Sequence, residues 1–399
     1  ELHYCFTSLD GATTYSSSID SQAVRDAVAA APSGSTVYLA GYCAGVASGQ
    51  LVTINQPLTL LGGYQAISGT GTVDWSIHDF ALYPTTVDAL GAGRVIKATA
   101  ALTVSELVVQ NGVAAGSDSA CPYVGCGGGI FADDLLTLDN VQLLRNTAEY
   151  GGGVYAAEPL TVTASLLRAN TTGNDGGAIY AASSLRLVAS ELNNNAATLG
   201  GGVYVVASAL ISATHFAANT ATTSGGAIAA DRLTLVASEV ISNTAASGAG
   251  ASLVGAALIQ STRFVENGAA AEGGAIVAYA PLTLTASTLV SNTADAGAGV
   301  YLTGPTVISA THFAGNQASN DGGAIYAFDP VTLTQSVLLN NRGDEGGGAY
   351  LTENMVISAT RFISNTAIDR GGAIFHNSAG GDDNAVYGRI VNALFVGNQ

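Results

Sequence analysis

Apolar and polar positions along this chain recur with a spacing of 23 to 25 residues. The most regular element is a Gly-Gly-Ala-Ile-Tyr or Gly-Gly-Gly-Val-Tyr segment or a close variant, which begins at Gly127, Gly151, Gly176, Gly200, Gly225, Gly248, Gly273, Gly297, Gly322, Gly346 and Gly371. So regular a spacing indicates a stacked repeat architecture. Function therefore has to be sought on a solenoid.

A second regular position is an Asn that follows an apolar residue by three places, as in the pair Leu143 and Asn146. We assign to this row Asn146, Asn170, Asn195, Asn219, Asn243, Asn267, Asn292, Asn316, Asn340 and Asn365. Between the Gly and Asn positions lie segments of period two, such as Leu160-Thr-Val-Thr and Leu282-Thr-Leu-Thr, which is typical of a strand with one buried face. Each repeat is therefore expected to hold three short strands.

A repeat of this length with three strands fits one coil of a parallel β-helix, in which each strand pairs with its copy in the next coil. We predict an all-β chain with a single parallel β-helix of about 13 coils, each of 24 to 25 residues. A helical repeat is disfavoured because the segments lack a 3.6-residue apolar period and contain paired glycines.

The first 50 residues break the repeat pattern. The pattern of residues 20–32 predicts an amphipathic helix with an apolar face at Ala23, Val24, Ala27 and Val28. A strand is expected after this helix. We predict residues 1–50 as a helical cap and residues 51–399 as the β-helix.

The carboxy end shows no such cap, because residues 395–399 stop inside a repeat. Either the chain is part of a longer protein, or another surface covers its last coil. A second copy could dock there through residues 1–18.

The Asn row has a structural interpretation. At a turn that recurs in every coil, Asn tolerates left-handed dihedrals, and copies about 4.8 Å apart can bond to one another as a ladder. The paired glycines are interpreted as backbone requirements rather than as a phosphate cradle, because no Gly-Lys-Ser/Thr signature accompanies them.

An aromatic row accompanies the glycines at Tyr155, Tyr180, Tyr204, Tyr301, Tyr326 and Tyr350. Each Tyr adjoins an apolar residue, so strand alternation places the two on opposite faces of the strand. Two interpretations stay open. The row is either a stabilising ladder between coils, or an exposed stripe suited to lateral packing or to stacking on sugar rings.

The four cysteines are even in number and lie outside the regular coils. We predict disulfides Cys5 to Cys43 and Cys121 to Cys126 among the three connectivities that four cysteines allow. A metal site is the alternative, but Cys121 and Cys126 have four residues between them and no neighbouring His.

The net charge of -17 and the pI of about 4.3 argue against partners such as nucleic acid or anionic membranes. Only 10% of the residues are charged, so the outer faces must be largely Thr, Ser, Ala and Asn, which suits an extracellular or cell-surface protein. No apolar stretch is long enough for a transmembrane helix. A start at Glu1 without Met is expected of a processed, secreted chain.

Gly-Gly-Ala-Ile combined with Phe-x-x-Asn, as at residues 225–228 with 264–267 and at 322–325 with 362–365, resembles the polymorphic outer membrane protein repeat. That repeat is known from chlamydial surface adhesins. The resemblance spans about residues 110–399 and implies a right-handed β-helix exposed at the cell surface. A carboxy-terminal segment that could form a barrel, as in autotransporters, is absent from this sequence.

Catalysis is an alternative because many β-helix proteins act on polysaccharides. Their sites use clustered carboxylates for hydrolysis, or bound calcium with a Lys or Arg base for elimination. The best acidic cluster is Asp382 and Asp383 with Arg389, and it lacks companion catalytic groups. Acidic turns at residues 174–175, 320–321 and 344–345 could at most bind calcium weakly. We therefore expect no cofactor and no enzyme activity.

The expected function is a structural protein of the cell surface that assembles head to tail into a filament. An adhesin that binds protein or glycan ligands ranks second, and a polysaccharide lyase or hydrolase ranks third.

Overall fold

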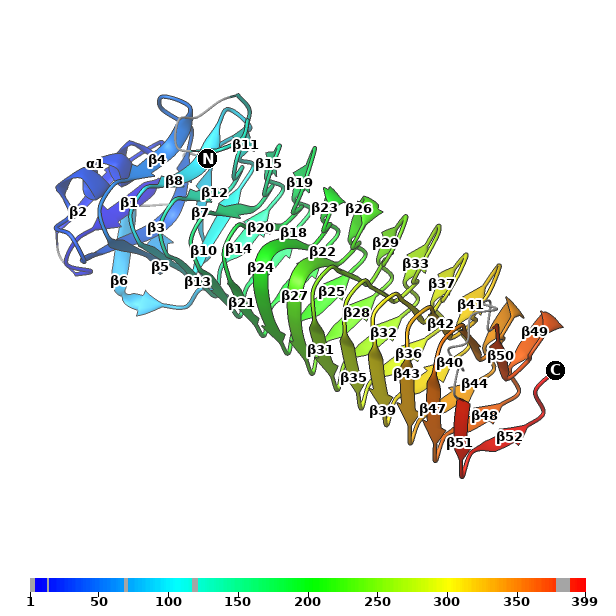
Figure 1. The fold of residues 1–399 in the computed structure, drawn as a ribbon. Coiled ribbons are helices and arrows are strands. Elements are labelled where there is room, and N and C mark those ends of the chain that lie inside the picture. Colours follow the sequence, from blue (N-terminus) through cyan, green and yellow to red (C-terminus); the bar gives the residue numbers. More distant parts are fainter. Residues whose placement is uncertain (1–3, 13, 68–70, 117–120, 378–387) are drawn as a thin grey trace. The chain divides into compact units, whose positions relative to one another are not determined.

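The computed structural model describes residues 4–12, 14–67, 71–116, 121–377 and 388–399. Within these residues the chain is almost entirely β, with one helix (Figure 1). It divides into two compact units, residues 1–198 with 202–206 and residues 199–201 with 207–399. In both units the strands form a parallel β-solenoid, as the sequence predicted.

The helix of the cap, α1 (Gln22–Ala30), buries the predicted apolar face of Ala23, Val24, Ala27 and Val28. The Asp20 carboxylate accepts a hydrogen bond from the Gln22 N–H at 2.8 Å, which satisfies one donor of the first turn. The helix stops at Ala30 because the residue before Pro32 is extended, as residues before proline usually are.

The strands around this helix include a hairpin that the sequence did not predict. β1 (Cys5–Ser8) pairs in antiparallel fashion with β2 (Tyr15–Ser18) and with β3 (Thr36–Ala44). β3 also pairs in parallel with β5 (Leu58–Ile67) and β7 (Thr85–Asp88), so the coils begin inside the region assigned to the cap. The neighbouring strands are β4 (Gln50–Ile54), β6 (Thr72–His78), β8 (Arg94–Ala98), β9 (Leu102–Ser105) and β10 (Leu107–Gln110).

Each regular coil runs through four short strands, one more than expected. The additional strand follows the Asn of each repeat and is often only two residues long, which is too short to show a period of two. In the first unit these coils contain β11 (Val113–Ala114), β12 (Ile130–Ala132), β13 (Leu136–Asp139), β14 (Gln142–Leu144), β15 (Thr147–Ala148), β16 (Val154–Ala156), β17 (Leu160–Thr163), β18 (Leu166–Arg168), β19 (Thr171–Thr172), β20 (Ile179–Ala181), β21 (Leu185–Val188) and β22 (Glu191–Asn193).

The second unit repeats the same order, with two pairs of strands merged into longer ones. β23 (Ala196–Leu199) and β24 (Val203–Ser212) lie where the chain passes between the units. The remaining strands are β25 (His215–Ala217), β26 (Thr220–Ser224), β27 (Ile228–Val236), β28 (Glu239–Ile241), β29 (Thr244–Ala245), β30 (Ala251–Leu253), β31 (Ala257–Gln260), β32 (Arg263–Val265), β33 (Gly268–Ala269), β34 (Ile276–Ala278), β35 (Leu282–Thr285), β36 (Thr288–Val290), β37 (Thr293–Ala294), β38 (Val300–Leu302), β39 (Thr306–Ser309), β40 (His312–Ala314), β41 (Gln317–Ala318), β42 (Ile325–Ala327), β43 (Val331–Thr334), β44 (Val337–Leu339), β45 (Arg342–Glu345), β46 (Ala349–Leu351), β47 (Met355–Ser358), β48 (Arg361–Ile363), β49 (Thr366–Arg370), β50 (Ile374–His376), β51 (Gly388–Val391) and β52 (Leu394–Val396).

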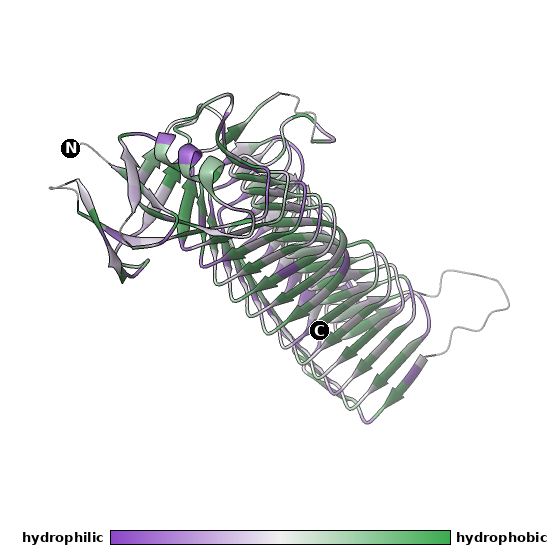
Figure 2. Ribbon diagram, turned by 90° about the vertical axis from the view of Figure 1, so that its left-hand side faces the viewer, coloured by the Kyte–Doolittle hydropathy of each residue, from purple (hydrophilic) through white to green (hydrophobic). Residues whose placement is uncertain are grey.

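Equivalent residues of successive coils lie directly beside one another, because the strands pair in parallel and in register. Leu143 pairs with Leu167 in the first unit, and Phe313 pairs with Leu338 in the second. Apolar residues recur at the same place in successive strands (Figure 2). Each fully buried Leu or Phe of such a row stabilises the fold by roughly 1.5–3 kcal/mol.

Interior Phe residues of the second unit have a glycine as their packing partner. A Cβ on Gly299 would lie 3.0 Å from a ring carbon of Phe313, and a Cβ on Gly348 would lie 3.1 Å from a ring carbon of Phe362. Each of these glycines belongs to the same coil as its Phe. The missing side chain leaves the space that the large ring fills.

Candidate functional site

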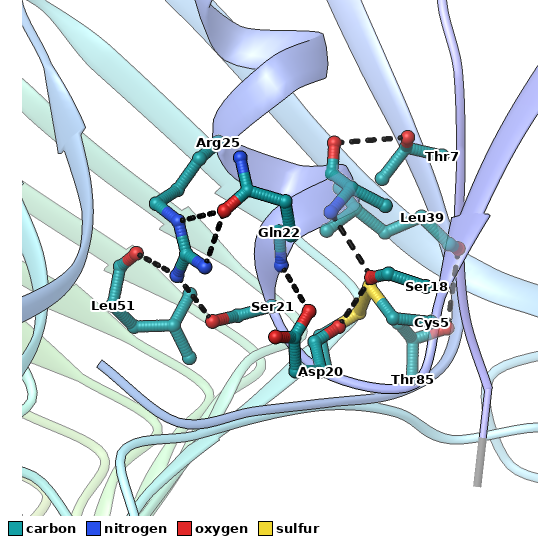
Figure 3. The surroundings of a disulfide bond; sticks show 12 residues. Cys5, Thr7, Ser18, Asp20, Ser21, Gln22, Arg25, Leu39, Leu51 and Thr85 are labelled. Atoms are coloured by element: carbon teal, nitrogen blue, oxygen red, sulfur yellow. Dashed lines mark hydrogen bonds between the residues drawn. A yellow bond between two sulfur atoms is a disulfide. The ribbon is translucent and has the colours of Figure 1, made fainter. Parts of the chain in front are cut away.

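Both predicted disulfides are present, and the other connectivities are excluded. Cys5 bonds to Cys43, with the two Cα atoms 4.6 Å apart, and Cys121 bonds to Cys126, with the Cα atoms 5.9 Å apart. The first bond ties β1 to β3 beneath the cap helix (Figure 3). Around it, the Thr7 hydroxyl donates to the carbonyl oxygen of Ala23 at 3.2 Å, which joins the hairpin to the helix.

The second disulfide closes a short loop over the aromatic row of the first unit. Tyr123 of this loop stacks on Tyr150, with ring centroids 4.3 Å apart, and directs its edge toward Tyr155 and Tyr180. Arg94 donates to the carbonyl oxygens of Cys126 and Gly127. The loop is thereby held against the outer side of the coils.

The aromatic row of the first unit is a stack of parallel rings. Tyr155 and Tyr180 have centroids 4.9 Å apart and planes 10° apart, and Tyr180 and Tyr204 have centroids 5.3 Å apart. Tyr155 and Tyr180 are buried although they lie on the strand face opposite the interior, because the loop covers them. Phe131 extends the stack at one end.

The row of the second unit has the same geometry. Tyr301 stacks on Tyr326 and Tyr326 stacks on Tyr350, with planes 14° and 4° apart. Neighbouring coils therefore cover the ring faces, and only the ring edges and hydroxyls can reach solvent. Since sugars stack on ring faces, this geometry favours the ladder between coils over a sugar-binding stripe.

The stacked tyrosines predict an alkaline loss of stability. Burial is the main cause that raises the pKa of Tyr155 to about 12, and the nearby Tyr123 and Asp133 contribute less. Burial is also the main cause that raises the pKa of Tyr326 to about 12, with smaller contributions from Tyr350 and Asp321. An unfolded Tyr has a pKa of about 10. Between about pH 10 and 12 the folded chain holds more protons, so stability falls as pH rises through this window and levels off above it.

Melting temperatures from circular dichroism at pH 8 to 12, together with absorbance titration of the phenolates, would measure this effect. Replacing Tyr155 and Tyr326 together with Phe keeps the stacked rings and should weaken the pH dependence. A melting temperature that stays constant across this window would contradict the prediction.

The Asn residues form a continuous column of hydrogen bonds within each unit. In the first unit, the backbone N–H and the Nδ2 of Asn146 both donate to Oδ1 of Asn170 at 3.0 Å, and Nδ2 also donates to the Val109 carbonyl oxygen. Asn170 bonds to Asn195 in the same way. The second unit repeats the pattern through Asn219, Asn243, Asn267, Asn292, Asn316, Asn341, Asn365 and Asn398.

The assignment of Asn340 to this row was wrong by one residue. Asn341 is the buried member, and its Oδ1 accepts from the N–H of Asn316 at 3.0 Å. Asn340 precedes it in the left-handed region with a φ of 54°, a position that other coils fill with several residue types, among them Ala218 and Ser242. The interior apolar residue is correspondingly Leu338 rather than Val337.

A second polar column went unnoticed in the sequence. A buried Ser or Thr lies five residues before most of the ladder Asn residues, as with Ser165 and Asn170. The hydroxyls of Ser165 and Ser190 each accept a backbone N–H of the preceding coil. Its members in the described coils are Ser165, Ser190, Thr214, Ser238, Thr262, Ser287, Thr311, Ser336 and Thr360. Five residues before Asn341 lies Ser336, whereas five residues before Asn340 lies Gln335. The Ser and Thr spacing would therefore have corrected the Asn340 assignment.

The acidic turns lie at corners of the coils, and two of their carboxyl groups have a raised pKa. Burial raises the pKa of Asp175, and burial followed by repulsion from Glu345, Asp344 and Asp295 raises the pKa of Asp321. Glu345 forms an ion pair with Arg370. Among the described residues, no three His, Cys, Asp or Glu side chains gather in a way that could hold a metal, and calcium binding stays a prediction. Asp382 and Asp383 lie outside the described residues.

Residues 310–327 match the Chlamydia polymorphic membrane protein repeat. They contain the Phe313 to Asn316 landmark, which lies in one coil, and the glycines at 322 and 323, which begin the next coil. The chain is thus a parallel β-solenoid that contains a repeat similar to the polymorphic membrane protein (Pmp) repeat. No curated protein matches its sequence significantly.

A solved structure that aligns with this Pmp-like protein is that of the Dettilon tailspike protein. It shares 11% identity with a TM-score of 0.29, and the alignment covers 86% of this chain and 59% of the tailspike chain. The likeness is distant. In the described part of the Pmp-like protein, no helix has the length and apolarity to cross a membrane.

Proposed function

We propose that this Pmp-like protein is a non-enzymatic structural protein of the cell surface or the extracellular space. The observation that carries the proposal is that the repeat's recurrent side chains contact the equivalent side chains of neighbouring coils. The buried Asn column, the Ser and Thr column and the stacked tyrosines all connect one coil to the next. Such residues stabilise the solenoid, so a structural role accounts for the recurrence of these side chains.

Other features support a location outside the cytosol. Two disulfides fit an oxidising compartment, and the repeat resembles that of a surface-protein family. The outward residues of β35 and β43 are Thr at both positions, so these strands present an uncharged polar face.

Antibody labelling of intact producing cells, compared with permeabilised cells, tests the location. Labelling without permeabilisation, or protein in the culture medium, is expected. Labelling only after permeabilisation would reject the surface assignment. Incubation of the purified chain with a panel of polysaccharides tests the absence of catalysis, and reproducible cleavage of any of them would overturn that part of the proposal.

A finer proposal is self-association through the edge formed by β51 and β52. Leu394, Phe395 and Val396 are 49%, 44% and 48% exposed, whereas Phe362, the equivalent of Phe395 in the preceding coil, is fully buried. Unpaired strand edges with apolar side chains favour pairing with another chain. In a longer protein, the next coil would occupy the same edge.

Negative-stain electron microscopy of residues 1–399 tests this association. Filaments or larger assemblies are expected, and Leu394→Asp should abolish them because it places a charge on the edge. Leu258→Asp is the control, because Leu258 is exposed on the outer face of β31, away from β51 and β52. This variant should leave the assemblies intact. Single particles in every sample would reject self-association.

Adhesion is the second candidate, and the match to a repeat of surface proteins favours it. An adhesin would use the outer faces of the coils to bind a protein or glycan on another surface. Binding of the purified chain to cells without any self-assembly would favour adhesion over the filament.

A further inference from the structure

A cavity of about 310 Å³ opens in the first unit beside the cap. Its walls come from β1, β3, β5 and the segment that leads into β7, and four of the lining residues are Tyr4, Tyr42, Tyr64 and Tyr83. The volume lies at the lower end of the range for small-molecule sites, which is about 300–1,000 Å³. It suits a ligand of a single ring.

The apolar part of the cavity wall is held in place by packing. Phe6 is 1% exposed, and Tyr64 is 9% exposed and stacks on the ring of His78 with centroids 4.5 Å apart. Trp75 packs against Tyr64 from another direction, with centroids 5.3 Å apart. The wall is therefore formed before any ligand binds. Leu82 lies at the rim and is 70% exposed.

Hydroxyl groups line the same cavity. The Tyr83 hydroxyl accepts a hydrogen bond from Nε2 of Gln65 at 3.1 Å, which leaves its own proton to donate. Thr86 adds a second hydroxyl from β7. The cavity thus combines apolar ring surfaces with hydroxyls that can both donate and accept.

The carboxylate near the cavity, Asp88, is ionised, and hydrogen bonds already occupy both of its oxygens. Oδ2 of Asp88 accepts from the Tyr42 hydroxyl at 2.7 Å and from Gln110 at 2.8 Å, and its Oδ1 accepts from the Leu90 N–H. Asn111 donates to both oxygens. Burial opposes ionisation of Asp88, but these donors outweigh it and keep the pKa of the carboxyl below its usual value.

This arrangement discriminates between classes of ligand. The acceptor sites of the Asp88 carboxylate are filled, so it offers little to a cationic ligand, although aromatic cages can bind ammonium groups. An anionic ligand would meet the field of a chain with a net charge of -17. A neutral ligand with an apolar face and several hydroxyls fits best.

We propose that the cavity binds one neutral sugar residue, a hexose or N-acetylhexosamine. The C–H face of the sugar packs on the aromatic wall, and its hydroxyls bond to Tyr83 and Thr86. This inference goes beyond the structural role proposed above and does not depend on it, because a spacer or filament subunit can bind a sugar without being an adhesin.

Saturation-transfer difference NMR on the full chain, with disulfides intact, tests the proposal. The probes are the methyl glycosides of glucose, galactose, mannose and N-acetylglucosamine, with choline and glucuronate as charged comparisons. Saturation transfer to at least one neutral glycoside at millimolar concentration is expected, with weaker transfer to both charged probes. Tyr83→Ala should weaken binding about tenfold, which corresponds to a loss of about 1.4 kcal/mol.

Two further variants keep the test decisive. Tyr83→Phe retains the ring and removes only the hydroxyl, so it should weaken binding by less than Tyr83→Ala does. Tyr279→Ala, at a 46% exposed tyrosine that does not line the cavity, should leave binding unchanged. Absence of transfer to all neutral glycosides, stronger transfer to choline or glucuronate, or equal loss in the Tyr83→Ala and Tyr279→Ala variants would each overturn the assignment.

Discussion

Asn341→Ala is expected to lower the free energy of unfolding by about 4 kcal/mol. Oδ1 of Asn341 accepts from the N–H and the Nδ2 of Asn316, and its Nδ2 donates to the Phe313 carbonyl oxygen and to Oδ1 of Asn365. The substitution removes these four hydrogen bonds from a fully buried site, at about 1 kcal/mol each. Denaturant unfolding followed by circular dichroism would measure the loss.

Asn340→Ala is the matched control, because it makes the same chemical change at the adjacent residue. Asn340 lies at the left-handed position, where Ala169 and Ala218 occur in other coils, so the expected cost is about 1 kcal/mol. Hydrogen exchange should localise the effect of Asn341→Ala to the N–H of Asn316, which loses its acceptor. Equal destabilisation by the two variants would contradict the assignment of Asn341 to the column.

Gly347→Ala is expected to destabilise the second unit by about 3 kcal/mol. A Cβ at this position would overlap the carbonyl oxygen of Thr366, which follows Asn365 in the same coil, and would lie 2.8 Å from the carbonyl oxygen of Gly372 in the next coil. These are backbone atoms, so relief requires the coils to separate, which disturbs the hydrogen bonds between them. Thermal unfolding of the variant would measure the loss.

Gly315→Ala provides the control for that substitution. The nearest neighbour of an added Cβ, outside the adjacent residues, is the Ser291 hydroxyl at 3.8 Å, so only the φ of 62° disfavours alanine. The expected cost is about 1 kcal/mol. A Gly347→Ala variant no less stable than Gly315→Ala would show that the coils tolerate a side chain at the paired glycines.

The sequence contained enough information for the solenoid, the apolar face of α1 and the disulfide pairing. The solenoid and the α1 face follow from apolar residues at a regular spacing. The disulfide pairing had only three alternatives. The register error at Asn340 arose because residues 337–341 offer two overlapping choices, three apolar residues followed by two Asn. The contact with the neighbouring coils selects Asn341, and the Ser five residues before it is the sequence signal for the same choice.

Other features depend on contacts that no local pattern records. The loop between Cys121 and Cys126 covers Tyr155 and Tyr180, and this burial could not be inferred from alternation along a strand. The sugar-sized cavity joins residues from β1, β3, β5 and β7, which are dispersed over some eighty positions of the sequence. Their proximity follows from pairing in the non-repetitive cap, where no period guides prediction.

The pairing of Phe313 and Phe362 with a glycine of their own coil has a consequence for how such a chain changes in length. In the second unit, Gly299 accommodates Phe313 and Gly348 accommodates Phe362, so a whole coil brings both the bulky ring and the space for it. Duplication or loss of entire coils therefore preserves the packing of the interior, whereas an insertion of a few residues within a coil displaces every later contact. The length of the protein can evolve by whole coils while the chemistry of its interior stays the same.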